Sequence, residues 1–125
     1  MATHKILMVD DDEDLHILYK LYLQGEAFEV LEAFDGAEAL ELLETQRPDL
    51  IILDMIMPKM DGEEFLMKLR SDKRFASMPV VIATVNEKIP PKLLDIGRPQ
   101  GFLRKPFSMD ELLTLIRQAL SIPSK

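Results

Sequence analysis

The sequence of 125 residues has no cysteine and no long apolar run. Without cysteine, the chain can form neither disulfides nor thiolate metal sites. Its longest apolar runs, such as Leu50–Leu53 with its neighbours, are about five residues long, whereas a membrane-spanning helix needs about 20. The N-terminus also lacks the apolar core of a signal peptide. Together these absences predict a cytoplasmic protein without a membrane partner.

Positive charge is scarce as well. Only 15 Lys and Arg residues stand against 22 Asp and Glu residues, so the formal net charge is −7. Since the chain offers no basic stripe for a phosphate backbone, we expect no direct nucleic-acid binding by this domain. The acidic residues are unevenly spread, with one continuous block at positions 10–14. Such blocks are usually solvated surface, but this one directly follows an apolar segment.

The chain has the length of one compact domain, which we expect to span residues 1–125. Short apolar runs alternate five times with segments of helical spacing. One run, Leu50–Leu53, is apolar throughout, which is the pattern of a strand covered on both faces. The five predicted strands are Lys5–Val9, Phe28–Leu31, Leu50–Leu53, Val80–Ala83 and Gly101–Arg104.

Side chains that cap helices stand before four of the helical segments. The predicted caps are Asp12, Asp35, Asp61 and Ser108. Gly25 is expected to end the first helix. The apolar spacing in this helix predicts a buried face made of Leu15, Leu18, Tyr19 and Tyr22.

The alternation of strands and helices predicts an α/β fold with a parallel sheet and helices on both faces. Five strands suit the flavodoxin-like order 2-1-3-4-5. The fourth helix is expected to be short or irregular, because Pro90, Pro91 and Pro99 leave room for only one or two turns. In such a sheet, ligands bind outside the carboxyl ends of the strands, near the switch point between strands one and three.

Polar side chains stand at the carboxyl ends of four predicted strands. They are Asp10 and Asp11 after the first, Asp54 after the third, Thr84 after the fourth and Lys105 after the fifth. Three carboxylates within a few ångströms of one another would have a repulsion energy on the order of several kcal/mol. They therefore either share protons or hold a cation. An all-oxygen set with room for water and phosphate oxygens suits Mg²⁺ better than Ca²⁺. We therefore predict a magnesium site at this edge.

Zinc is not expected there. His4 precedes the first strand and His16 lies on the first helix, so both are predicted to lie away from the carboxylates. Taken one at a time, the other polar residues have simpler interpretations. Asp12 is a helix cap, Thr84 a structural hydroxyl and Lys105 a solvated lysine. The prediction of a site depends on several such residues meeting at one edge.

Five segments match a known family in order and spacing. They are Ile6–Asp11, Leu53–Pro58, Asp61-Gly62, Thr84 and Lys105–Phe107. This pattern resembles the receiver domain of bacterial two-component response regulators, in the CheY-like superfamily. The resemblance covers essentially the whole chain. It implies a phosphorelay signalling switch that phosphorylates and dephosphorylates itself and is not a turnover enzyme.

By this resemblance, Asp54 accepts a phosphoryl group from a sensor histidine kinase or a phosphotransfer protein. Lys105 then pairs with one phosphoryl oxygen, and the Thr84 hydroxyl donates a hydrogen bond to another. The switch would regulate an output domain or a downstream protein. The implied Mg²⁺ ligands are Asp10, Asp11, Asp54 and the backbone carbonyl of Ile56.

Four further features follow from the resemblance. The Lys105-Pro106 bond is expected to be cis and to aim the lysine inward. Phe102 occupies the position of the switch aromatic, although it could equally be an ordinary residue of the fifth strand. Val85 stands where the family usually has a small residue. Ile56 and Asn86 flank the path of the hydrolytic water, and an apolar Ile56 predicts a long-lived acyl phosphate.

Two alternative functions remain open at this point. A haloacid-dehalogenase-type phosphatase also uses an Asp-x-Asp motif after an apolar strand, as in Asp10–Asp12. No threonine follows at the expected place, however, and the chain is short for that fold with its cap. A pseudo-receiver would dock a protein without being phosphorylated, but it would not need the complete set of polar residues.

Overall fold

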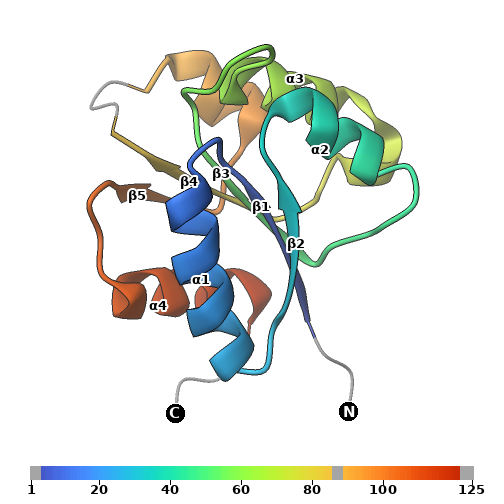
Figure 1. Cartoon of the computed structure of the whole chain (residues 1–125). Helices are drawn as coiled ribbons and strands as arrows, with labels where there is room; N and C mark the ends of the chain where they lie inside the picture. Colours follow the sequence, from blue (N-terminus) through green and yellow to red (C-terminus); the bar gives the residue numbers. More distant parts are fainter. Residues whose placement is uncertain (1–3, 86–88, 122–125) are drawn as a thin grey trace.

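A five-stranded parallel sheet in the order β2-β1-β3-β4-β5 forms the centre of the molecule (Figure 1). The computed structural model describes residues 4–85 and 89–121. The predicted fold and strand order are confirmed. The strands are β1 (Lys5–Val9), β2 (Glu29–Ala33), β3 (Leu50–Leu53), β4 (Val80–Thr84) and β5 (Gly101–Arg104).

The predicted second strand, Phe28–Leu31, is displaced in the structure. β2 begins one residue later and continues to Ala33, because its pairing with β1 runs from Lys5↔Glu29 to Val9↔Ala33. Glu32 interrupts the apolar run in the sequence, and for this reason the prediction ended the strand at Leu31. The predicted fourth strand is likewise extended by Thr84, which pairs with Arg104 of β5.

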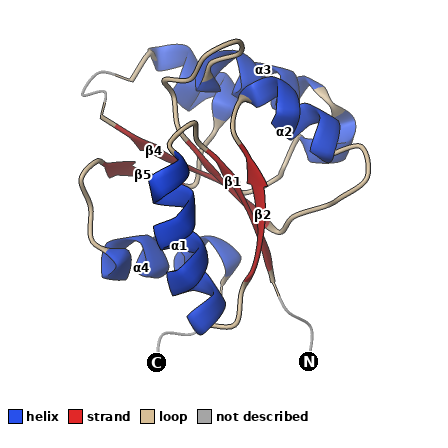
Figure 2. Ribbon diagram, in the orientation of Figure 1, coloured by secondary structure: helices blue, strands red, loops and turns tan. Residues whose placement is uncertain are grey.

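Helices cover both faces of the sheet (Figure 2). On one face lie α1 (Glu13–Gly25) and α4 (Met109–Leu120), and on the other lie α2 (Gly36–Leu42) and α3 (Gly62–Ser71). A 3₁₀ turn, η1 (Lys73–Phe75), follows α3. None of the helices in the described residues is both long and apolar enough to cross a membrane.

The two faces of the sheet each pack against their own apolar core, because successive strand residues point to opposite sides. Leu7 and Ile51 belong to the core under α2 and α3, whereas Ile6 and Ile52 belong to the core under α1 and α4. All four residues of β3 are buried, as predicted for a strand covered on both sides.

The buried face of α1 differs from the predicted one. Leu18 is 50% exposed, and the buried residues are His16, Tyr19 and Leu23. Their spacing of three and four residues is that of one helix face. Tyr19 is buried as predicted, and Leu15 and Tyr22 pack partly buried against the core under α1 and α4. The prediction fails at Leu18, and it missed His16 because it did not count a histidine among the buried residues.

In the described part of the segment between β4 and β5, residues 89–100, lies one π-helical turn, η2 (Leu93–Gly97), which confirms the short or irregular fourth helix. The buried guanidinium of Arg70 ties this turn to α3. It donates to the carbonyl oxygens of Gly97 (2.6 Å), Phe75 (3.0 Å) and Arg98 (3.3 Å). One arginine thereby joins the end of α3 to the segments that precede β4 and β5.

Candidate phosphoacceptor and metal site

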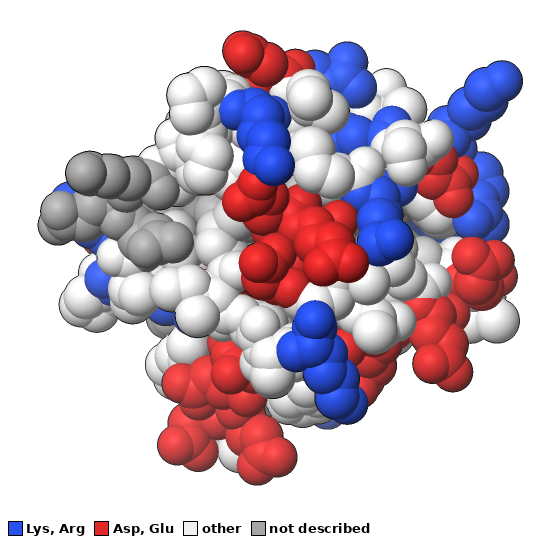
Figure 3. All heavy atoms as spheres, turned by 90° about the horizontal axis from the view of Figure 1, so that it is seen from above, with Lys and Arg blue, Asp and Glu red and all other residues white. Residues whose placement is uncertain are grey.

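Three carboxylates meet at the carboxyl edge of the sheet, as predicted. Asp10, Asp11 and Asp54 each offer an oxygen atom within 4.8 Å of the others. Asp10 and Asp54 are buried, whereas Asp11 is exposed. Seen from above, this side of the molecule shows acidic side chains in its middle and separate basic ones around them (Figure 3). The arrangement offers oxygen ligands for a hard cation on a surface open to solvent.

The sheet itself brings the two buried aspartates together. The backbone N–H of Asp54 donates to the carbonyl of Val9 at 2.9 Å, and the N–H of Asp10 donates to the carbonyl of Ala33 at 3.2 Å. The ladder therefore continues one residue beyond the ends of β1 and β3. Because these strands are adjacent and parallel, the residues that follow them lie side by side.

Lys105 reaches into this cluster from the end of β5. Its ammonium lies 2.6 Å from Asp10 Oδ2 and 3.5 Å from Asp54 Oδ2. The backbone N–H of Lys105 donates to the carbonyl of Thr84 at 2.9 Å. The Lys105-Pro106 peptide bond is cis, as predicted. A positive charge thus faces two carboxylates at the position predicted from the sequence.

The environment of Asp54 disfavours its ionised form. Burial raises the pKa of this carboxyl most, and the negative charges of Asp10 and Asp11 raise it further. The Lys105 ammonium and the N–H of Ile56, which lies 3.4 Å from Asp54 Oδ1, act in the opposite direction but do not cancel the rise. Any additional positive charge at this edge would therefore stabilise the ionised form of Asp54.

The other predicted residues lie around this cluster. Thr84 is buried at the end of β4, and the following Val85 is 57% exposed. Phe102 on β5 is 39% exposed, and Ile56 is 52% exposed in the loop after Asp54. Asn86 lies outside the described residues.

His16 was predicted to lie away from this edge, and that prediction was wrong. Its ring is 1% exposed, and Nε2 lies 2.6 Å from the carbonyl oxygen of Asp10. The contact is to the backbone, so His16 joins the site without adding a ligand to the carboxylates. The spacing from His16 to Tyr19 and Leu23 was the signal in the sequence that could have placed it inside.

Asp12 caps a helix, as expected. Its carboxylate accepts from the N–H groups of Asp14 (2.9 Å) and Leu15 (3.2 Å) at the start of α1. The carboxylates that lie within 4.8 Å of one another are those of Asp10, Asp11 and Asp54, and Asp12 is not among them. The phosphatase alternative therefore finds no support in the geometry.

The start of α3 packs tightly against the loop that follows Asp54. The N–H of Gly62 donates to the carbonyl of Met55 at 2.9 Å. A methyl group on Gly62 would overlap the carbonyl oxygen of Asp54 and lie 2.7 Å from Met55 Cα. Only glycine allows this approach of helix and loop.

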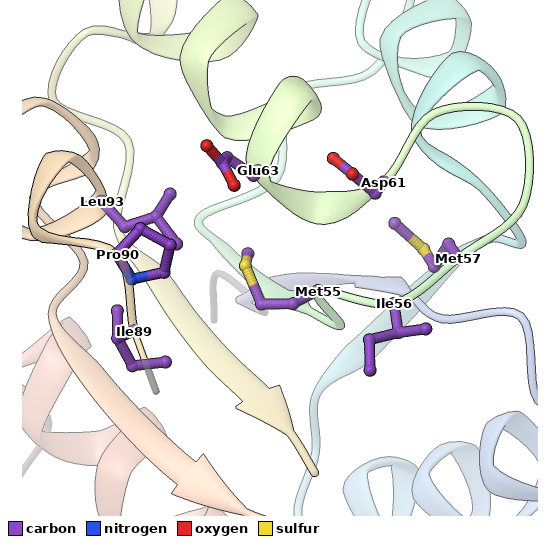
Figure 4. Close-up of a pocket in the computed structure, with 8 residues that line it drawn as sticks. All are labelled: Met55, Ile56, Met57, Asp61, Glu63, Ile89, Pro90 and Leu93. Carbon is purple, nitrogen blue, oxygen red and sulfur yellow. The ribbon is translucent and has the colours of Figure 1, made fainter. Parts of the chain in front are cut away.

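A shallow pocket of about 300 Å³ lies beside the same loop (Figure 4). Its apolar walls come from the residues after Asp54 and from the segment that leads into η2, while two carboxylates of the α3 start stand at its rim. The lining residues are Met55, Ile56, Met57, Asp61, Glu63, Ile89, Pro90 and Leu93.

Comparison with known proteins agrees with the geometry. A family model described as the response regulator receiver domain matches residues 6–117. The chain belongs to the response regulator receiver family. Membership makes it a receiver in phosphorelay signalling, and nothing in the comparisons points to the phosphatase or the pseudo-receiver.

Curated relatives of this receiver are transcriptional regulators. PhoP of Bacillus subtilis, an alkaline phosphatase synthesis transcriptional regulatory protein, is 36% identical over 118 residues, which cover 93% of this chain and 48% of PhoP. RpaA of Synechocystis, a DNA-binding dual master transcriptional regulator, is also 36% identical over 118 residues, with the same coverage. The receiver thus spans about half the length of these relatives.

The solved structures that are similar to this chain include other receivers. The chemotaxis response regulator CheY4 of Vibrio cholerae superposes with a TM-score of 0.86 at 32% identity, covering 95% of this chain and 100% of CheY4. The receiver domain of the sensor histidine kinase PA1611 from Pseudomonas aeruginosa has a TM-score of 0.85 at 25% identity, covering 96% of this chain and 99% of that one. That structure has a magnesium ion coordinated in its active-site cleft.

Proposed function

We propose that Asp54 is the phosphoacceptor of this receiver and that the reaction depends on Mg²⁺. The observation that supports this most strongly is the meeting of Asp10, Asp11 and Asp54 at one edge, with the Lys105 ammonium between two of them. A buried carboxylate beside two others is costly unless positive charge arrives. A divalent cation and a lysine are the groups that allow a negative phosphoryl donor to approach it.

The donor set fits magnesium. The three carboxylates provide oxygen ligands only, and their oxygens lie within 4.8 Å of one another. Ligands of Mg²⁺ stand at about 2.0–2.1 Å from the ion, so two of them are separated by at most about 4.2 Å and only a small contraction is needed. The carbonyl of Ile56 is proposed as the remaining protein ligand. When bound, Mg²⁺ neutralises carboxylate and phosphoryl oxygens that would otherwise repel each other.

The protein residues then have separate roles in phosphoryl transfer. An oxygen of Asp54 attacks the phosphorus of a phosphohistidine whose other ring nitrogen is protonated, an O–P bond forms, and the N–P bond breaks. The bonding electrons return to the ring, which already carries that proton and leaves as neutral imidazole. Lys105 exchanges its carboxylate partners for a phosphoryl oxygen and balances the added charge. Thr84, already buried at the end of β4, donates its hydroxyl to another phosphoryl oxygen.

The conformational switch is proposed to involve Thr84 and Phe102. A phosphoryl group adds roughly two negative charges, and these draw the Thr84 hydroxyl toward Asp54. The movement leaves space beside β5, where Phe102 is 39% exposed and can turn inward. Val85 follows Thr84 directly and limits how far the segment shifts. Chemical shifts of the Phe102 ring that stay unchanged when beryllofluoride binds would contradict this role.

The phosphoryl donor is proposed to be a cytoplasmic sensor histidine kinase or phosphotransfer protein. The phosphorylated receiver is proposed to act as a switch on an output domain or a downstream protein, and it is not expected to turn over a substrate. The net charge of −7 gives the receiver itself no surface suited to DNA. Binding of nucleic acid would therefore fall to another part of the protein or to a partner.

Phosphorylation by acetyl phosphate tests the assignment. In the presence of Mg²⁺, intact-mass spectrometry should detect one added phosphoryl group on the wild type and none on Asp54→Ala. Asp12→Asn is the matched control, because it removes a neighbouring carboxylate while keeping a good helix cap. It should be labelled like the wild type. Labelling of Asp54→Ala, or hydrolysis of many equivalents by the wild type, would contradict the proposal.

A further inference from the structure

The buried ring of His16 contacts three residues beside the acidic cluster. Its Nε2 lies 2.6 Å from the carbonyl oxygen of Asp10, and its Nδ1 lies 3.0 Å from Glu32 Oε2. The ring also stacks on Phe34, with the centroids 4.2 Å apart and the planes 25° from parallel. His16 thereby joins α1 to the end of β1 and to β2.

The contact with a carbonyl oxygen determines the protonation of Nε2 in the His16 ring. A carbonyl oxygen can only accept a hydrogen bond, so Nε2 carries a proton and donates it to Asp10. The backbone N–H of Asp10 donates to Ala33 at 3.2 Å. Both polar backbone atoms of Asp10 are therefore held, one by β2 and the other by α1.

We infer that His16 is a positioning residue that fixes the Asp10–Asp11 peptide and so sets the spacing of the metal-binding carboxylates. The carbonyl that it binds belongs to the peptide unit joining Asp10 to Asp11. Because a peptide unit is planar, holding its oxygen fixes the direction in which the chain enters Asp11. Glu32 and Phe34 hold the ring in place. The inference rests on the magnesium site proposed above.

This positioning matters because the cluster assembles against repulsion. Oxygen atoms of the Asp10, Asp11 and Asp54 carboxylates lie within 4.8 Å of one another. Asp11 is exposed, so burial does not restrain it as it restrains the other two. A loosened Asp10–Asp11 peptide lets the Asp11 carboxylate move away from Asp54. The free energy needed to bring this carboxylate back then reduces the affinity for the metal. Loss of a group that orients metal ligands typically lowers metal affinity on the order of tenfold or more.

Calorimetric titration with Mg²⁺ alone tests the inference without any phosphoryl donor. His16→Leu removes both ring nitrogens and should weaken Mg²⁺ binding on the order of tenfold. His16→Gln keeps an amide N–H that can reach the Asp10 carbonyl, and it should recover most of the lost affinity. A recovery of this kind depends on the donor and not on how well the side chain fills space.

Leu23→Ala is the matched control for lost stability. Leu23 is buried on the same face of α1, about two turns further from the acidic cluster. The variant should unfold at a lower temperature while binding Mg²⁺ like the wild type. The inference is overturned if His16→Leu binds Mg²⁺ with wild-type affinity, or if Leu23→Ala loses as much affinity as His16→Leu.

Glu32→Leu decides the question where His16→Leu does not fold. It leaves the histidine present but removes the carboxylate that holds Nδ1, so affinity should fall by a smaller factor. Wild-type affinity in a folded Glu32→Leu variant, together with an unfolded His16→Leu, overturns the inference. A wild type that binds no Mg²⁺ would instead refute the proposed magnesium site, so the two failures are distinguishable.

Discussion

The ammonium of Lys105 lies closer to Asp10, at 2.6 Å, than to the proposed phosphoacceptor Asp54, at 3.5 Å. If Asp10 is a metal ligand, as proposed, lysine and metal compete for the same carboxylate before phosphorylation. In the proposed mechanism the lysine then leaves Asp10 to pair with a phosphoryl oxygen. This exchange of partners links the charge on Asp54 to the side chains around it.

Removing the lysine charge should affect metal binding and phosphorylation in opposite directions. We expect Lys105→Met to bind Mg²⁺ several-fold more tightly, because the competing ammonium is gone. Labelling by acetyl phosphate should slow by roughly tenfold or more, because the ammonium that meets one phosphoryl oxygen is gone. Calorimetry and a labelling time course measure the two effects. Lys59→Met, at a 75% exposed side chain near Asp35, is the control and should change neither. Weaker Mg²⁺ binding by Lys105→Met would contradict the competition.

Neutralising Asp54 should stabilise the metal-free protein. Because the folded pKa of Asp54 is raised above 3.8, the folded state binds more protons than the unfolded state just above that pH. Stability then falls as pH rises through the folded pKa, and ionised Asp54 remains a cost at neutral pH. Asp54→Asn should gain on the order of 1–3 kcal/mol at pH 7 in EDTA.

Urea unfolding at several pH values measures this gain. The advantage of Asp54→Asn should shrink as pH falls toward 3.8, where the wild-type carboxyl becomes protonated in both states. Excess Mg²⁺ should also reduce it, by stabilising the wild type. An Asp54→Asn variant less stable than the wild type at pH 7 in EDTA would be incompatible with the electrostatic account.

The lifetime of the acyl phosphate should depend on Ile56. This side chain is 52% exposed beside Asp54 and has no polar atom with which to hold a water molecule. Ile56→Asn supplies an amide there, and we expect dephosphorylation to accelerate several-fold. Decay of the labelled protein after removal of acetyl phosphate gives the rate. Leu94→Asn, at a 51% exposed residue of η2, is the matched control. Equal decay rates for wild type and Ile56→Asn would refute the prediction.

Arg70 should contribute far more to stability than Arg74, although both lie near the end of α3. Arg70→Met leaves buried carbonyls without their donor and should cost roughly 2–4 kcal/mol. Arg74 is exposed and bonds to Asp72 and Glu44 at the surface, so Arg74→Met should cost much less. Chemical denaturation of the two variants provides the comparison. Similar losses would mean that the three carbonyl contacts of Arg70 add little.

A methyl group at Gly62 should disturb both stability and phosphorylation. Gly62→Ala places Cβ against the backbone of Asp54 and Met55, and either α3 or the loop must move. We expect a loss of about 1–3 kcal/mol and slower labelling of Asp54. Gly25→Ala is the control, because a Cβ there meets nothing within 4 Å. A Gly62→Ala variant that matches Gly25→Ala in both measurements would show that the close approach is unimportant.

The sequence alone was sufficient to predict the sheet order and the edge that carries the site. Apolar runs in β1, β3 and β4 are continuous because both faces of these strands are buried, so a short pattern identifies them. Parallel connectivity then places every carboxyl end at one edge. The positions of Asp10 and Asp54 follow directly, since each comes immediately after its strand. The capping roles of Asp61 and Ser108 could also be predicted from the sequence, because a cap accepts a hydrogen bond from a backbone N–H only three residues away.

Only the tertiary structure decided which partners the long side chains take. Lys105 meets Asp10 across 95 positions in sequence, and Arg70 bonds to carbonyls 27 and 28 residues away. His16 turns inward because a carbonyl and an aromatic ring just after β1 and β2 and a carboxylate of β2 surround it, and no local pattern in the sequence predicts these contacts. Local periodicity encodes which face of a segment is apolar. Hydrogen bonds between distant segments depend on distances that arise only when the sheet and helices have packed.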